Sequence, residues 1–326
     1  MTLAEQFTSL DSILKRTRTY WQCTAFDFDA IPWPELRGIL NSLTDEQVAT
    51  LDTKQNELID FFNPHIKLLD ELQLLCKLPQ ANTPRYDYPF WISNGIKGRK
   101  FEQLQDFVSA LPNTKLPVLE WCAGKGHLGR MLAFNGATQV SSVELQATLC
   151  EQGQKAALQQ GLAMQFSQVD VLKDDTTSLF NTQMHAVALH ACGALHQAMM
   201  RKAIAANVQQ ISFSPCCYHL FTPNDYLPMS ELAKQSQLRL THRDLKLALQ
   251  ETVTAPTRVD KIRKTELEWR LGFDALRRSI TNELHYVSVP SVNKAVFSGS
   301  FKSFCEWAGD KKALKIPQDV DYEYFL

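Results

Sequence analysis

The sequence predicts an α/β fold: a doubly wound, mostly parallel sheet with a helical N-terminal cap and a helical C-terminal elaboration. Short apolar runs alternate with helical stretches over residues 115–214, the pattern of parallel strands joined by crossover helices. The first of these runs breaks into a glycine turn that opens a helix. We therefore expect a cap and connection at 1–95, a core at 96–222 and an elaboration completing the fold at 223–326.

The N-terminal cap is predicted from helical spacing. Apolar residues recur on one helical face over 3–14 and again after Pro34. Thr44 and Gln47 form a capping box, which predicts a helix that begins there and continues to Phe62.

The core and the C-terminal part are predicted element by element. Five strands are expected, at 117–121, 139–144, 164–170, 185–190 and 208–214. The intervening helices should begin near His127, Leu145, Ser178 and Ala194. Beyond Pro223 the pattern indicates helices at about 243–251, 258–280 and 300–313, and a strand at 284–289.

Composition excludes several classes of protein. The 34 Lys and Arg against 35 Asp and Glu give a net charge of −1, so no chain-wide field favours nucleic acid or an anionic membrane. The first 15 residues lack a signal-peptide layout, and no apolar run is long enough to span a membrane. We expect a cytoplasmic protein with no membrane partner. The eight cysteines contain no CxxC pair, so reduced thiols and no structural metal are expected; the oligomeric state stays open.

The glycine turn allows two interpretations. The spacing Gly124-x-Gly126-x-x-Gly129 satisfies the dinucleotide-binding fingerprint, and Glu144 lies 20 residues beyond Gly124, where a ribose-binding acid belongs. This interpretation predicts an NAD-dependent oxidoreductase.

The second interpretation uses the acid that precedes the glycines. Glu120-x-Cys122-x-Gly124-x-Gly126 matches the acidic-start loop of S-adenosylmethionine-dependent methyltransferases, with Cys122 in place of the first glycine. A carboxylate there suits the cationic amino-acid end of that cofactor and would repel a pyrophosphate on the same helix terminus. We therefore favour S-adenosylmethionine. Cys122 is expected at negative φ, facing the sheet, because positive φ would cost about 1–2 kcal/mol.

Acids end three successive predicted strands. Glu144 is expected to accept hydrogen bonds from ribose hydroxyls, and Asp170 to bind the adenine amino group. Ordinary surface carboxylates near helix starts are the alternative for each acid taken singly. The expected cofactor-binding residues are Glu120, Ala123, Gly124, Gly126, Glu144, Asp170, Val171, His190 and Cys192.

At these residues the sequence resembles a branch of the Rossmann-like methyltransferases. This branch includes methyltransferase-like proteins, the glutathione-transferase-C-terminal-domain-containing protein and, more distantly, tRNA ribose 2′-O-methyltransferases. The resemblance spans about residues 96–251 and rests on the glycine turn, the basic segment at 96–102, His190–Leu195 and Ser214–His219. It implies a Rossmann-like methyltransferase fold with S-adenosylmethionine as cofactor.

The candidate catalytic residues follow from the sheet. Ligands of an open parallel sheet bind at the carboxyl ends of its strands, so the loops after strands four and five should face the methyl group. We expect His190 or His219 to accept or orient the proton of the acceptor, and Lys100 to act as an orienting cation.

The cysteines of these two loops allow three further interpretations. Cys192, Cys216 or Cys217 could act as a nucleophile, as in RNA cytosine-C5 methyltransferases, although the usual proline-cysteine is absent. They could bind zinc, but adjacent Cys216 and Cys217 cannot easily share one tetrahedral site. They could also simply pack under the cofactor.

The acceptor is hypothesised to be RNA, either tRNA or rRNA. Segment 258–278 holds seven basic residues against four acidic ones, and Lys97, Arg99 and Lys100 add a basic rim near the expected pocket. A solvated helix face is the alternative for the first segment. A protein or small-molecule methyltransferase, or a catalytically silent protein that binds S-adenosylmethionine or a partner, remains open.

Overall fold

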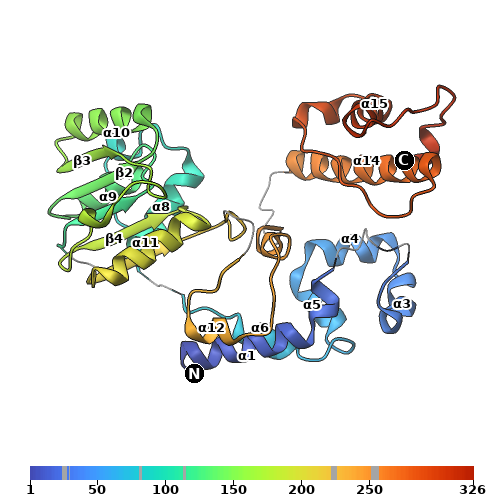
Figure 1. Cartoon of the computed structure of the whole chain (residues 1–326), viewed down its shortest axis with the longest axis horizontal. Coiled ribbons are helices and arrows are strands. Elements are labelled where there is room, and N and C mark those ends of the chain that lie inside the picture. The colour runs from blue at the N-terminus through green and yellow to red at the C-terminus, as the bar shows by residue number, and fades with distance from the viewer. Residues whose placement is uncertain (24–27, 29, 81–82, 113–114, 222–225, 251–256) are drawn as a thin grey trace. The chain divides into compact units, whose positions relative to one another are not determined.

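The computed structural model describes residues 1–23, 28, 30–80, 83–112, 115–221, 226–250 and 257–326 (Figure 1). The chain divides into two compact units. Unit 1 comprises residues 1–77, 236–238 and 252–326, and unit 2 comprises 78–235 and 239–251. The segment boundaries expected at 95/96 and 222/223 remain a prediction.

Unit 2 contains a five-stranded sheet in which every pairing is parallel. Its strands are β1 (Val118–Trp121), β2 (Val140–Glu144), β3 (Met164–Gln168), β4 (His185–Leu189) and β5 (Gln210–Ser214). Their order is β3-β2-β1-β4-β5, which confirms the doubly wound fold. The winding reverses between β1 and β4, so the carboxyl ends of these two strands flank the topological switch point.

Successive residues of the strands enter different cores. Val118 of β1 packs in the core on one face of the sheet, and Leu119 and Trp121 pack in the core on the other. This alternation follows from the period of two residues in a strand. Glu120 points to the same face as Val118, which places a carboxylate among apolar side chains.

Helices cover both faces of the sheet, as Figure 1 shows. Those of unit 2 are α7 (Phe90–Ser93), α8 (Gly98–Ala110), α9 (His127–Phe134), α10 (Ala147–Gln159), α11 (Ala194–Ala205), α12 (Glu231–Gln235) and α13 (Leu247–Gln250). Side chains of α8, α9 and α10 enter the first core, and those of α11 enter the second. The indole N–H of Trp121 also donates to the carbonyl of Leu195, which ties β1 to α11.

Two predicted helices of unit 2 are shorter in the structure. The helix expected near Ser178 is a 3₁₀ turn, Thr177–Leu179, because the surrounding threonines and Asn181 have low helix propensity. The helix expected at 243–251 is a 3₁₀ turn, Asp244–Lys246, followed by α13; residues 251–256 lie outside the described part of the chain.

Unit 1 is helical in its described residues. Its helices are α1 (Leu3–Arg16), α2 (Arg18–Trp21), α3 (Pro34–Asn41), α4 (Asp45–Thr53), α5 (Gln55–Phe62), α6 (Leu69–Leu75), α14 (Thr257–Thr281) and α15 (Phe301–Lys312). The 3₁₀ turns η4 (Lys294–Ser298) and η5 (Glu323–Phe325) complete it. An aromatic core that includes Trp269, Phe273 and Phe304 joins α14 to α15.

The capping box of Thr44 and Gln47 is confirmed, but the helix that it opens does not reach Phe62 without a break. The backbone turns extended at Lys54, with φ −120° and ψ 92°. The hydroxyl of Thr53 donates to carbonyls one turn earlier in α4. Such side-chain bonds to the backbone of the preceding turn bend helices.

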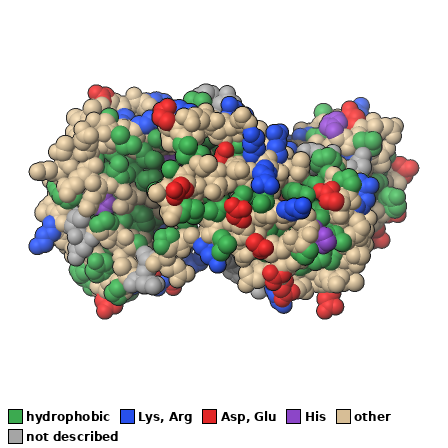
Figure 2. All heavy atoms as spheres, turned by 90° about the horizontal axis from the view of Figure 1, so that it is seen from below, with side chains coloured by type: hydrophobic (Ala, Val, Ile, Leu, Met, Phe, Trp, Pro, Cys, Tyr) green, Lys and Arg blue, Asp and Glu red, His purple; other side chains and the backbone are tan. Residues whose placement is uncertain are grey.

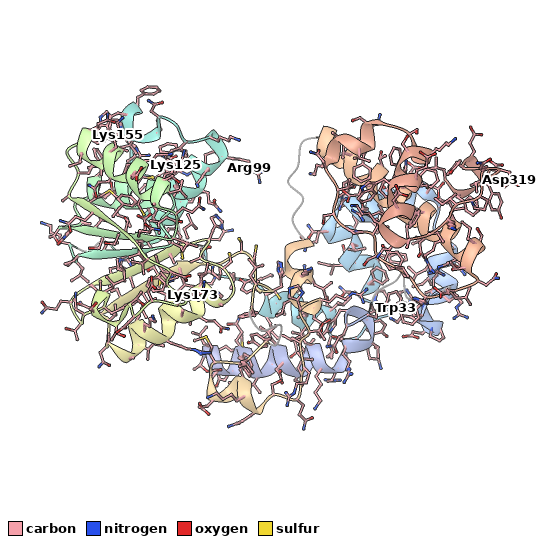
Figure 3. All side chains as sticks on the ribbon, turned by 45° about the horizontal axis from the view of Figure 1, so that its top comes forward. Trp33, Arg99, Lys125, Lys155, Lys173 and Asp319 are labelled. Carbon is pink, nitrogen blue, oxygen red and sulfur yellow. The ribbon has the colours of Figure 1, made fainter. Side chains whose placement is uncertain are left out.

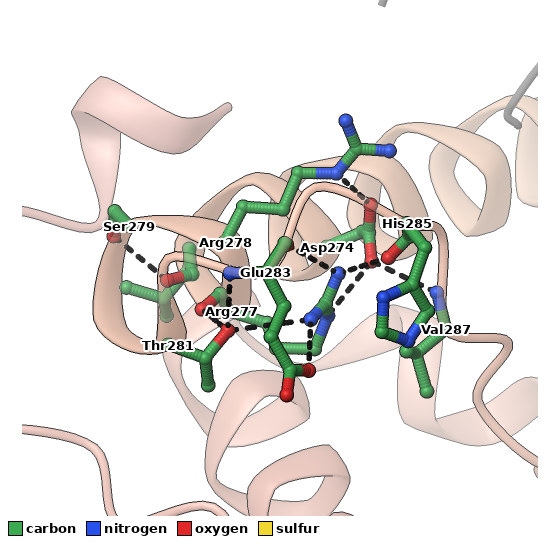
Figure 4. Close-up of polar contacts among 9 residues, drawn as sticks. Asp274, Arg277, Arg278, Ser279, Thr281, Glu283, His285 and Val287 are labelled. Atoms are coloured by element: carbon green, nitrogen blue, oxygen red, sulfur yellow. Dashed lines mark hydrogen bonds and ion pairs between the residues drawn. The ribbon is translucent and has the colours of Figure 1, made fainter. Parts of the chain in front are cut away.

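The strand predicted at 284–289 is not formed, because side chains of α14 take up the backbone groups there (Figure 4). The guanidinium of Arg277 donates to the carbonyls of Glu283 and His285. Asp274 Oδ1 accepts from the N–H of Val287 at 3.2 Å. Asp274 and Arg277 are both buried and pair at 3.0 Å. A partner strand is therefore not needed to satisfy this backbone.

The surface carries mixed charge. On the face drawn in Figure 2, Lys and Arg side chains are interspersed with Asp and Glu, so no single sign covers that face. None of the helices in the described ranges combines the length and apolarity that crossing a bilayer requires.

A side chain at Gly129 in α9 is predicted to destabilise unit 2 for steric reasons. A Cβ there would collide with Glu120 Oε2 and lie 2.7 Å from Met164 Cε. Overpacking of this kind costs about 1–3 kcal/mol. Gly129→Ala should lower the free energy of unfolding of unit 2 by that amount, measured by hydrogen exchange of the β1 and β2 amides.

Gly98→Ala in α8 is the matched control, because no atom lies within 4 Å of its Cβ position. The free energy of unfolding of this variant, measured by the same hydrogen exchange, should stay within about 0.5 kcal/mol of that of the parent protein. Equal protection in the two variants would contradict the proposed packing of Gly129 against Glu120.

Candidate functional site

A cavity of about 420 Å³ lies at the carboxyl edge of the sheet, where β1 and β4 end. Its volume falls within the roughly 300–1,000 Å³ typical of small-molecule sites. Its lining comprises Lys100, Leu104, Glu120, Trp121, Cys122, Ala123, Gly124, Lys125, His127, Leu128, Leu149, Leu189 and His190. Another hollow, of about 540 Å³, runs along α10 and contains none of the predicted site residues. The cavity at the switch point is therefore the candidate site.

The turn from β1 into α9 shapes one wall of the cavity. Its backbone is left-handed at Cys122, Gly124 and Gly126, with φ of 57°, 58° and 66°. The expectation of negative φ at Cys122 is therefore wrong. Between these residues, Ala123 donates its N–H to the carbonyl of Val143 at 2.9 Å, which pins the turn to β2 and overrides the strain at Cys122.

Glu120 is buried beneath this turn. Its carboxylate accepts from the N–H of Gly129 at 2.9 Å and from the hydroxyl of Ser142 at 2.7 Å. Burial raises the pKa of Glu120 to about 7, although these two hydrogen bonds and the charges of Arg130 and Lys100 act in the opposite direction. The group therefore titrates near neutral pH.

Glu144, at the end of β2, holds the turn from the other side. Its Oε2 accepts from the N–H of Gly124 at 2.9 Å, and its Oε1 accepts from the N–H of Gln146 at 3.0 Å. The predicted acids of β1 and β2 thus both bind the glycine turn. Gly126 does not line the cavity, and a Cβ built on it would collide with the ring of Phe166.

The third predicted acid lies elsewhere. Asp170 follows β3 by two residues, where its carboxylate accepts from the N–H of Leu172 and pairs with Lys173 at 3.3 Å. Val171 is buried in the core on the α11 side of the sheet. Neither residue lines the cavity, so the adenine contact of Asp170 and the cofactor contact of Val171 stay predictions.

His190, which directly follows β4, and Lys100 of α8 both line the cavity. His190 Nε2 lies 2.9 Å from Gln103 Oε1. An amide oxygen only accepts, so Nε2 carries the hydrogen, and Nδ1 of the neutral ring keeps its lone pair. Burial and the charge of Lys100 lower the pKa of His190. The imidazole is therefore neutral at pH 7 and can accept a proton.

His219 and Cys192 lie outside the cavity lining. The ring of His219 contacts that of His242 edge-on, with centroids 5.1 Å apart. Burial and the charges of His242 and Lys246 lower the pKa of His219. Cys192 is buried in the loop after β4. The catalytic role of His219 and the cofactor contact of Cys192 remain predictions.

Three further residues belong to the site although sequence reasoning did not select them. Gln103 orients His190, and Lys125 and His127 line the cavity from the glycine turn. Burial lowers the pKa of His127 to about 4, so its ring is neutral. The signals were present: Lys100 and Gln103 are spaced i and i+3 on one face of α8, and Lys125 and His127 flank Gly126.

The chain is similar to known proteins over part of its length. Residues 97–224 match the model of a family described as a methyltransferase domain. No curated protein sequence matches the chain.

Several solved structures are similar to the chain. TYW2 of P. horikoshii in complex with MeSAdo is 17% identical, with a TM-score of 0.24, over 28% of this chain and 34% of that one. The [4+2]-cyclase SpnF is 17% identical, with a TM-score of 0.30, over 47% and 54% of the two chains. Magnesium protoporphyrin IX methyltransferase of Synechocystis PCC 6803 with bound SAH is 19% identical, with a TM-score of 0.26, over 47% and 68%. The chain thus spans about a third of the first protein and half of the second.

The raised pKa of Glu120 predicts a pH dependence of stability. In the unfolded chain the group titrates near 4.5, and in the folded protein near 7. Its contribution to the free energy of unfolding is therefore fully present below pH 4.5 and is lost as the pH rises through 7, by about 3 kcal/mol. Glu120→Gln has no charge to bury: its amide oxygen can accept from the N–H of Gly129, and its NH2 can donate to the hydroxyl of Ser142, which then turns from donor to acceptor. The loss should therefore disappear.

The measurement is hydrogen exchange of the β1 and β2 amides across this pH range, because these amides report on unit 2. If the parent protein and the Glu120→Gln variant lose the same stability as the pH rises, Glu120 is not a buried ionisable carboxyl group.

Proposed function

We propose that this chain methylates RNA. The methyl transfer would be carried out by residues 97–224, which match a methyltransferase domain of the Rossmann-like, S-adenosylmethionine-dependent class. The observation that carries the proposal is the cavity at the switch point, where the glycine turn, Lys100 and His190 meet. Ligands of open parallel sheets bind at such switch points, outside the carboxyl ends of the strands.

The cavity fits the cofactor in shape. No atom lies within 4 Å of a Cβ built on Gly124, so the turn leaves an open cradle that a side chain would fill. Gly124 also has φ 58°, a conformation that glycine adopts without strain. A ligand can therefore lie directly against this backbone.

The cavity fits the cofactor in charge as well. Glu120, a carboxyl group with a pKa of about 7, lies on the wall with Lys100 and Lys125, so the wall offers a partly ionised acid and two cations to a zwitterionic amino-acid end. Bound S-adenosylmethionine supplies an electrophilic methyl group on a sulfonium. The chain's own residues hold the reactants in line, and positioning of this kind can reach effective molarities of about 10⁵–10⁸ M.

Proton transfer is assigned to His190. A hydroxyl or amine acceptor loses a proton as it gains the methyl group. The neutral imidazole of His190, with Nε2 hydrogen-bonded to Gln103, offers Nδ1 for that proton. General base catalysis increases the rate by a factor of about 10²–10⁴, which is a smaller contribution than that of positioning.

RNA as the acceptor is supported by a basic rim, defined as Lys97, Arg99, Lys100 and Lys125, all exposed on unit 2. Lys100 and Lys125 line the cavity itself. Figure 3 shows Arg99 pointing outward from the first turn of α8, and Lys125 at the glycine turn. Phosphates of a bound strand would be held by such cations.

Exposed aromatic rings lie shortly before the basic rim in the sequence. Phe90 and Trp91, in α7 just before Lys97, are 77% and 40% exposed, and Trp91 packs edge-on against exposed Phe134 with centroids 5.6 Å apart. Exposed aromatics beside cations are typical of single-stranded nucleic-acid binding, because bases stack on them.

Segment 258–278 contributes less to this proposal than the sequence suggests. Arg270 bonds Glu266 and the carbonyls of Val289 and Pro290, and Arg277 and Arg278 both pair with Asp274. These cations therefore stabilise unit 1, and the proposal rests on the basic rim of unit 2.

Gly124→Asp should weaken binding of radiolabelled S-adenosylmethionine by at least about tenfold, equivalent to about 1.4 kcal/mol. The new side chain fills the cradle and strains the turn. Gly161→Asp is the matched control, since Gly161 has φ 63° and open space at its Cβ but lies outside the cavity. Undiminished binding to Gly124→Asp, or equal loss in both variants, would refute the cofactor site.

Lys97→Ala and Arg99→Ala should each weaken RNA binding and lower the slope of log affinity against log salt by about 1, because each removes one phosphate contact. Binding of S-adenosylmethionine should not change. Lys155→Ala on α10, also exposed, is the control of equal charge change.

The acceptor class is tested by methyl marks in RNA and protein from deletion and parent cells. Loss of a mark from RNA supports the proposal. Loss from protein alone, or from neither pool, would replace RNA by a protein or a small-molecule acceptor. A chain that binds S-adenosylmethionine but transfers no methyl group to any cellular extract would be a silent binding protein.

A further inference from the structure

Three cysteine side chains converge beside the candidate site. Cys192 lies in the loop after β4, and Cys216 and Cys217 lie in the loop after β5. The Sγ atoms of Cys192 and Cys216 are 3.1 Å apart, and those of Cys216 and Cys217 are 3.5 Å apart. All three sulfur atoms lie within 4.8 Å of one another.

The fold holds the two loops together, so the convergence does not depend on the thiols alone. The N–H of His190 donates to the carbonyl of Ser214 at 3.0 Å, and the N–H of Ala194 donates to the carbonyl of Leu220 at 2.8 Å. Gly193 has φ 59°, and a Cβ there would collide with the carbonyl of Leu220. Backbone contacts thus fix the positions from which the thiols project.

The backbone around Cys192 suits a charged sulfur. Its Sγ accepts from the N–H groups of both Cys216 and Cys217, at 3.2 Å each. Hydrogen bonds of this kind stabilise a thiolate and are the usual outer-shell contacts of metal-bound sulfur.

The spacing of the sulfur atoms matches a metal site. Zinc binds cysteine sulfur at about 2.3 Å, so two sulfur atoms at tetrahedral positions are about 3.8 Å apart. The observed separations of 3.1 Å and 3.5 Å require shifts of less than an ångström. Adjacency of Cys216 and Cys217, which argued against a shared site in the sequence, is overcome because the loop is irregular and brings both sulfur atoms together.

We propose that Cys192, Cys216 and Cys217 bind one zinc ion through three thiolates, with the fourth coordination position open to solvent or to a ligand. Among the residues that the structure describes, no fourth His, Cys, Asp or Glu joins the group. Three protein ligands with one open position is the pattern of reactive rather than closed structural zinc sites. Binding releases the thiol protons to solvent. Exposed Cys216 gives the ion a path of entry.

Zinc is favoured over a disulfide by the third thiol and by the two N–H donors. A disulfide would need only one pair of sulfur atoms and an oxidant, and it would leave the remaining thiol without a role. Soft thiolate ligands select zinc among the abundant divalent ions.

The test uses the full chain, reduced and stripped of metal, titrated with cobalt(II) as a spectroscopic substitute for zinc. One equivalent should produce thiolate-to-cobalt charge-transfer absorption, and one equivalent of zinc should abolish it. Cys192→Ser, Cys216→Ser and Cys217→Ser should each weaken binding at least about 100-fold, the upper range for loss even of an outer-shell partner. Cys76→Ser, an exposed cysteine of unit 1, is the matched control and should bind as the parent does.

Folding of each serine variant is checked by hydrogen exchange of the β4 and β5 amides, and Cys216→Ser, at the exposed cysteine, is the mildest change. Absence of charge-transfer absorption from the reduced parent protein would overturn the proposal. So would equal cobalt binding by all four variants, or isolation of a Cys192–Cys216 disulfide in a protein that binds no metal after reduction. None of these outcomes depends on S-adenosylmethionine or on the acceptor.

Discussion

The buried carboxylate of Glu120 is the interaction on which the site depends. The side chain projects from the apolar face of β1 and accepts hydrogen bonds from the N–H of Gly129 and the hydroxyl of Ser142. One side chain therefore connects β1, α9 and β2. The close approach requires a glycine at 129. Glu144 makes the equivalent contact to Gly124 from the end of β2. Two acids therefore set the path of the glycine turn, and that path shapes one wall of the cavity.

Two of the six non-glycine residues with positive φ in the described part of the chain lie at the same edge of the sheet. Cys122 follows β1 and His190 follows β4, and both are non-glycine residues with positive φ, 57° and 64°. Each such residue costs on the order of 1–3 kcal/mol and persists only where its surroundings enforce it. At the switch point the enforcement comes from backbone bonds to neighbouring strands. The result at His190 is an imidazole held toward the cavity and hydrogen-bonded to Gln103.

Much of the sheet and half of the site could be predicted from sequence, for physical reasons. The central strands β1 and β4 are buried along most of their length and are mostly apolar, and the glycine turn after β1 marks the edge of the sheet where ligands bind. The features that could not be predicted from the sequence depend on contacts between residues that are distant in the sequence. The backbone at 284–289 is satisfied by Asp274 and Arg277 instead of a strand, and Cys122 is forced to positive φ by the bond that follows it. The convergence of Cys192 with Cys216 likewise required the pairing of two loops.

The central claim is that S-adenosylmethionine occupies the cavity between the glycine turn and His190. The most direct test is a crystal structure of the full chain grown with S-adenosylhomocysteine, the product of the proposed reaction. The account predicts ligand density against the backbone of Gly124, with the thioether directed toward His190. Density confined to the hollow along α10, or a cavity that stays closed at saturating ligand, would contradict it.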